Sequence, residues 1–169
     1  GEGFQQDMRD MIREIKRDIS KAFSSAEYAY MKTQLIQEST THRNEQLEQL
    51  KETVESKDFQ LQSTPTGLSV VAIGDGGQPM SEGEFSALSQ DRKQNILENR
   101  QYLDAHLKQA ILEFRIGDKG INDRISDMDR RIVQDITDVI VNEIQDKYET
   151  NPEVVGYLQE VSKDILVHK

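Results

Sequence analysis

The chain has 169 residues, of which 31% are charged and only 35% hydrophobic, and it contains neither cysteine nor tryptophan. Its net charge of -10 argues against nucleic acid or an anionic membrane as a partner, because both require clustered Lys and Arg. The sequence contains no run of 18 apolar residues that would span a bilayer. We expect a cytoplasmic protein built from long helices, whose narrow apolar stripes need few hydrophobic residues.

The first part of the chain is patterned as two helices. Over residues 4–23 the apolar side chains recur in steps of three and four, which predicts a helix with one apolar face. Ser25 is placed to cap a second helix, predicted over 26–57. Between Leu35 and Leu47, polar residues occupy the positions of the apolar stripe of this second helix, so we expect loose packing or another partner there.

The stretch 59–88, which we call the tip, interrupts the helical pattern. It holds five of the ten glycines and two of the three prolines. Apolar and polar residues alternate over 59–64, turn residues follow, and a β-branched run covers 68–73. These features predict a small antiparallel hairpin. Ser81 and Glu84 then have the spacing of a capping box for a short helix.

The longest helix is predicted over 89–149. Its apolar residues follow a heptad pattern that begins at Leu103 and shifts phase after Ile121, ending at Val139. Glycines interrupt this helix at positions 117 and 120, where they would permit a bend or the close approach of another chain. Asn151 and Pro152 end it, and a last helix is predicted over 152–167.

These lengths predict that the chain turns back on itself at the tip. Residues 26–57 would then pack on 90–121, and residues 4–23 on 124–149. The expected fold is mainly α: one domain over 1–169, formed by an elongated antiparallel coiled-coil hairpin with a small β-hairpin and a short helix at its tip.

No pattern in the chain favours catalysis. The glycines of GDGGQPMS lack the spacing and the lysine of a phosphate loop, so a tight turn is favoured. Ser81 comes too late for the D-G-x-S context of a protease serine and is interpreted as a helix cap. We therefore predict no catalytic residue and no cofactor site in this chain.

Two charged or titratable groupings remain as weaker possibilities. The predicted pairing puts His42 and His106 at nearly the same height, where Glu38, Glu45 or Asp104 could add metal ligands. No H-x-x-x-H or C-x-x-C spacing supports such a site, so surface histidines are favoured and no metal is predicted. Asp129 and Arg130 lie beside the apolar stripe and could form a bridge between helices.

The apolar side chains of the tip are the candidate contacts for a protein partner. They can either bind flexible polypeptide or cover one another, and the second alternative is favoured because the tip has so little other core. The candidate residues are Phe59, Leu61, Leu68, Val70, Met80 and Phe85.

Five blocks of sequence, in this order and spacing, resemble a known family. The blocks are KAFSSAEY at 21–28, PTGLSVV at 65–71, DGGQPMSEGEFSAL at 75–88, MDRRI at 128–132 and KYETNPEVVGYLQEVSKDI at 147–165. Together they are similar to the helical insert of bacterial Lon-related ATP-dependent proteases. Gly1-Glu2-Gly3 also resembles the lead-in from the family's nucleotide-binding module, and we expect the chain to be a segment of a larger protein.

The resemblance implies that the chain is part of a larger, ring-forming protein. Such a parent would carry an AAA+ module that binds ATP and Mg²⁺ and a protease domain with a Ser–Lys dyad, and would form rings, expected to be hexamers. The partners implied are protein substrates and neighbouring subunits. This chain shows no Walker motif and no dyad, so it is expected not to be an enzyme itself. The alternative is a structural or adaptor coiled coil that mediates oligomerisation.

Overall fold

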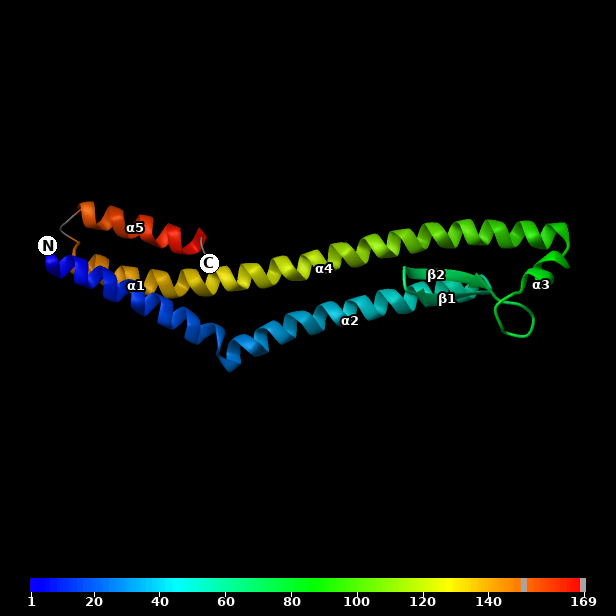
Figure 1. The fold of residues 1–169 in the computed structure, drawn as a ribbon, viewed down its shortest axis with the longest axis horizontal. Helices are drawn as coiled ribbons and strands as arrows, with labels where there is room; N and C mark the ends of the chain where they lie inside the picture. Colours follow the sequence, from blue (N-terminus) through cyan, green and yellow to red (C-terminus); the bar gives the residue numbers. More distant parts are fainter. Residues whose placement is uncertain (150–151, 168–169) are drawn as a thin grey trace. The chain divides into compact units, whose positions relative to one another are not determined.

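The computed structural model describes residues 1–149 and 152–167, and it is mainly α, as the sequence predicts (Figure 1). The elements in chain order are α1 (Glu2–Phe23), α2 (Ala26–Ser56), β1 (Phe59–Thr64), β2 (Gly67–Ala72), α3 (Glu82–Ser86), α4 (Gln90–Lys147) and α5 (Pro152–Val167). Asn151, predicted to help end the long helix, lies outside the described residues. No helix within the described ranges combines the length and the apolar character needed to cross a membrane.

The chain divides into two compact units, which we describe separately. Unit 1 comprises Gly1–Ile36 and Ile121–Lys169, and unit 2 comprises Gln37–Gly120. Unit 1 therefore contains α1, the start of α2, the second half of α4, and α5. Unit 2 contains the rest of α2, the tip and the first half of α4. The two long helices contribute to both units.

The core of unit 1 is formed by three helices rather than two. Met8, Met11 and Ile15 of α1 pack with Ile140 and Val141 of α4 and with Leu158 of α5. The sequence predicted that the α4 stripe ends at Val139, but that side chain is 59% exposed. This expectation was wrong because α5 packs against α4, and a three-helix core buries a different face from a two-helix stripe.

Two polar contacts join the helices of unit 1. Asp7 of α1 accepts hydrogen bonds from Lys147 Nζ at 2.6 Å and from the Tyr148 hydroxyl at 2.5 Å. The bond from Lys147, followed by that from Tyr148, lowers the pKa of the Asp7 carboxyl. The hydrogen bond to Asp7 raises the pKa of both Lys147 and Tyr148. Lys147 is exposed, whereas Asp7 and Tyr148 are half-buried. Because solvent reaches the ion pair, the contact fixes the pairing of α1 with the end of α4 more than it stabilises the fold.

Asp129 forms the bridge between helices that its position suggested. Its Oδ1 accepts a hydrogen bond of 2.7 Å from the hydroxyl of Tyr28, near the start of α2. Partial burial and this contact with Asp129 raise the pKa of Tyr28 to about 12. Arg130 instead forms an ion pair of 3.7 Å with Asp127 on its own helix. Ser25 caps α2 as predicted, because its Oγ accepts a hydrogen bond from the Tyr28 backbone N–H at 3.1 Å.

In unit 2, α2 and α4 run antiparallel. Arg43 of α2 forms an ion pair of 3.1 Å with Asp118 of α4, and Leu50 and Val54 share a buried cluster with Leu103. No side chain of α2 before Leu50 is buried, which agrees with the predicted polar middle of its apolar stripe. α4 continues as one helix through both of its glycines at 117 and 120, and a Cβ at either position would have no neighbour within 4 Å.

The pairing of α2 with α4 is displaced from the predicted one. The sequence placed residue 58 beside residue 89 and paired 26–57 with 90–121. In the structure Lys57 Nζ lies 5.1 Å from the ring centre of Tyr102, thirteen residues further along, or roughly 20 Å of helix at ~1.5 Å per residue. Tyr28 accordingly meets Asp129, beyond the predicted partner segment. The displacement leaves the first turns of α4 beyond the end of α2. The base of the hairpin, the turns that follow β2 and α3 lie beside them instead (Figure 1).

The hairpin forms as the sequence predicts. Phe59 pairs with Ala72, Leu61 with Val70 and Ser63 with Leu68, across a two-residue turn at Pro65 and Thr66. Cross-strand partners point to the same face, so the apolar residues of both strands gather on one side. That side packs on α2 and α4 as part of the buried cluster, while Gln60 and Gln62 lie on the opposite, exposed side.

One buried polar atom of unit 1 has no partner. Thr137 of α4 is fully buried, and within the described residues its Oγ1 forms no hydrogen bond. A buried hydroxyl without a partner costs about 1–3 kcal/mol. The Thr137→Val variant keeps the shape and removes the hydroxyl, so we expect it to raise the free energy of unfolding by about 1 kcal/mol in urea denaturation. Thr137→Ser, which keeps the hydroxyl and loses a methyl, should lower it; a valine variant less stable than the parent chain would contradict this account.

Candidate functional site

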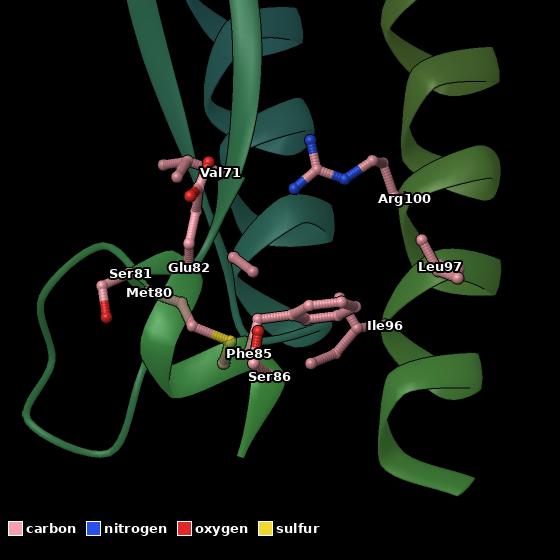
Figure 2. A pocket seen from close by; sticks show the side chains of 10 residues that line it. Val71, Met80, Ser81, Glu82, Phe85, Ser86, Ile96, Leu97 and Arg100 are labelled. Carbon is pink, nitrogen blue, oxygen red and sulfur yellow. The ribbon is translucent and has the colours of Figure 1, made fainter. Parts of the chain in front are cut away.

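Unit 2 has a groove of about 460 Å³ between the hairpin, α3 and the first turns of α4 (Figure 2). We call it the tip groove. It exists because α2 ends before it reaches this part of α4, leaving one helix face to be covered only by the hairpin and α3. The lining residues are Val71, Ala72, Met80, Ser81, Glu82, Phe85, Ser86, Ile96, Leu97 and Arg100.

Local chemistry fixes α3 at one end of this groove. Ser81 is the N-cap of α3, and its Oγ accepts a hydrogen bond from the Glu84 backbone N–H at 3.1 Å. The Ser81 hydroxyl also lies 3.4 Å from Glu84 Oε1, which completes the predicted capping box. The cap holds Phe85 toward Ile96 of α4, as Figure 2 shows. On the side of α4, Lys93 Nζ lies 5.9 Å from the centre of the Phe85 ring.

The charged residues of the groove lie on different walls. Arg100 extends from α4 toward the hairpin (Figure 2), with its guanidinium carbon 5.7 Å from the centre of the Phe59 ring. No ion pair holds Arg100 within the part of the chain that the structure describes. Glu82 lies on the α3 side. The groove is thus a largely apolar channel with one available cation, which suits a polypeptide better than a small charged metabolite.

The six predicted contact residues separate into three groups. Phe59 and Val70 are only 2% and 6% exposed and belong to the buried cluster of unit 2. Leu61 and Leu68 are half-buried and pack against that cluster. Met80 also packs against that cluster. Both Met80 and Phe85 line the groove. Of the six residues, only Met80 and Phe85 line the groove, while the other four pack within the tip.

Sequence analysis missed the α4 wall of the groove. Ile96 lies seven residues before Leu103 and continues the heptad pattern beyond the point where α2 ends. The heptad pattern of α4 therefore extends past the part of the helix that α2 can cover, and this was a signal in the sequence. Leu97, which is 47% exposed, lies outside this pattern, and Arg100 occupies a position of the heptad with a charged side chain. Only the arrangement of the tip gives these two residues a role.

The remaining sequence candidates are not brought together as sites. The glycine stretch forms turns, with Gly74 N–H donating to the Gln78 carbonyl at 2.9 Å and Gly77 N–H to the Gly74 carbonyl at 3.0 Å. Among the described residues, no group of three His, Cys, Asp or Glu side chains could hold a metal.

The predicted alignment of the two histidines was wrong. The residue next to His42, Arg43, contacts Asp118. Asp118 lies twelve residues beyond His106, roughly 18 Å along the helix at ~1.5 Å per residue. The ring of His106 instead contacts that of Tyr102 on its own helix, with ring centres 4.5 Å apart and the ring planes tilted by 56°. The displaced pairing of α2 with α4 separates the two imidazoles.

No protein-family model matches the chain, and no curated protein matches it in sequence.

Proposed function

We propose that this chain is a non-catalytic, protein-binding helical module that serves as the insert of a Lon-like ATP-dependent serine protease. The observation that carries the protein-binding part is the tip groove, an apolar channel bordered by exposed Leu97 and by Phe85. The resemblance of the five sequence blocks supports the placement in a Lon-like parent. In that parent ATP and Mg²⁺ would bind to the AAA+ module, and this chain would hold neither.

The size and composition of the groove suit part of a polypeptide. Sites for small ligands commonly enclose about 300–1,000 Å³ and combine apolar walls with a few polar groups. The tip groove, at about 460 Å³ with Met80, Phe85 and Ile96 in its walls, falls in this range. One or two apolar side chains of an unfolded substrate would fill it. In the ring-shaped parent, the same module would engage substrates or gate their entry, and it would also contact neighbouring subunits.

The test of substrate binding is a matched pair of substitutions on α4. Leu97→Ser changes a groove residue that is 47% exposed, and Leu112→Ser changes a residue that is 51% exposed and does not line the groove. Burying a leucine side chain is worth about 1.5–3 kcal/mol. Leu97→Ser should therefore weaken binding of reduced, carboxymethylated α-lactalbumin about tenfold in fluorescence anisotropy, and Leu112→Ser should leave it within twofold. Circular dichroism would verify that both variants keep the helix content of the parent chain.

Two outcomes would contradict the proposal. One is absence of binding to the unfolded protein by the parent chain. The other is equal weakening by both substitutions, which would mean that exposed leucines bind unfolded protein without a defined site.

A structural coiled coil that mediates oligomerisation is the second candidate. Leu112 and Ile116, one helical turn apart on α4, are 51% and 71% exposed and would supply an apolar contact for another copy. Because unit 2 pairs its own helices, we expect the chain to be a monomer of 19.4 kDa by light scattering at micromolar concentration. A mass of twice this value, returning to that of the monomer in an Ile116→Ser variant, would favour the coiled-coil function instead.

A further inference from the structure

The tip begins a third β-strand and does not complete it. Beyond β2 the chain turns and runs back antiparallel to it, with a bridge between Ile73 and Pro79. Gly74 N–H donates to the Gln78 carbonyl at 2.9 Å, and Met80 N–H donates to the Ala72 carbonyl at 2.8 Å. The next residue, Ser81, caps α3 and turns the chain away. The pairing therefore stops at Met80 and Ala72, and the rest of β2, back to its start at Gly67, has no third strand beside it.

The rest of that edge of β2 is unpaired. Ile73 N–H donates to the Asp58 carbonyl at 2.9 Å, toward β1. Hydrogen-bonding direction alternates along an antiparallel pair, so Val71 and Ser69 also bond toward β1, whereas Val70 and Leu68 direct their backbone N–H and C=O groups away from it. Within the described residues the sheet has two strands only. The N–H and C=O groups of Leu68 and Val70 thus form an open strand edge.

This edge adjoins the tip groove and lacks the usual protection. Ala72 and Met80, the last pair of the unfinished strand, both line the groove. Natural sheets commonly block free edges with lysine, proline or a bulge, because an open edge pairs readily with another strand. The sequence of β2, GLSVVA, contains no proline and no charged residue. Figure 2 shows the strands, α3 and α4 around the residues that line the groove.

We propose that an extended segment of a substrate protein adds to β2 as its third strand, antiparallel to it and in line with Pro79 and Met80. Its backbone would bond to the N–H and C=O groups of Leu68 and Val70. A side chain opposite Val70 points to the same face as Val70, toward α4, and would pack beside the groove. Backbone bonds supply affinity that does not depend on sequence, and the groove selects an apolar side chain. The inference rests on the proposed substrate-binding function and specifies the conformation in which the substrate is held.

The experiment probes backbone bonding without changing the protein. The probe is a ten-residue peptide of alternating leucine and threonine with a lysine at each end, prepared with one N-methylated amide at each position in turn. In an added strand every second N–H bonds to β2. N-methylation should therefore weaken binding at least tenfold at alternate positions and less than threefold at the intervening ones. A peptide bound as a helix would not show this period of two, and that result would overturn the inference.

Amide hydrogen exchange locates the bound strand. Saturation with the unmethylated peptide should slow exchange of the Leu68 and Val70 amides at least tenfold, because both face the incoming strand. The Phe59 and Leu61 amides, on the opposite edge of the sheet, serve as controls and should change less than twofold. Protection of these control amides in place of Leu68 and Val70 would overturn the proposed edge.

The two proposals fail in different ways. If the Leu97→Ser variant loses binding to carboxymethylated α-lactalbumin but the peptide shows no alternation or does not bind, strand addition is wrong and the groove still binds substrate. If Leu97→Ser leaves binding to the unfolded protein unchanged, the substrate-binding function itself is wrong.

Discussion

The packing of the hairpin's apolar face on the paired helices α2 and α4 is the contact on which unit 2 depends. α2 ends at Ser56, and its last residues lie beside Tyr102 rather than beside the start of α4. Beyond that point the base of the hairpin, the turns that follow β2 and α3 lie beside α4 at Arg92, Ile96 and Leu97. A two-stranded hairpin is only marginally stable alone, and an apolar helix face adds no stability until another surface covers it. The hairpin and the helix pair therefore each supply apolar surface that the other lacks, and Phe59 and Val70 are buried in one cluster with Val54 and Leu103.

The same arrangement leaves a groove and an open strand edge at the tip. Because α3 and the hairpin cover only part of α4, a groove remains beside Ile96 and Leu97. The cap at Ser81 that forms α3 also ends the third strand prematurely, which leaves the edge at Leu68 and Val70 open. An apolar channel next to an unpaired strand edge is suited to an extended polypeptide with apolar side chains, and this is the partner that we propose.

Local features of the sequence predicted most of the elements. The caps at Ser25 and Ser81, the hairpin turn and the helix over 152–167 all depend on residues within a few positions of one another. Long-range register was less predictable. The exposure of Val139 required knowledge that α5 packs on α4, and the separation of His42 from His106 followed from the displaced pairing. Leu97 and Arg100 became candidates only once the tip was placed beside them, because Leu97 lies outside the heptad pattern and Arg100 is a charged residue at one of its positions.

The most direct measurement is a nuclear Overhauser spectrum of the full chain with labelled methyl groups. The account predicts cross-peaks from the Ile96 methyls to side chains of the tip, namely Phe59, Ala72 or Met80, with which Ile96 shares the walls of a second, more polar cavity of about 310 Å³. If Ile96 instead showed cross-peaks to Leu50 and Val54 of α2 and none to the tip, α2 would extend to the start of α4. The tip groove and the edge beside it would then not exist as described.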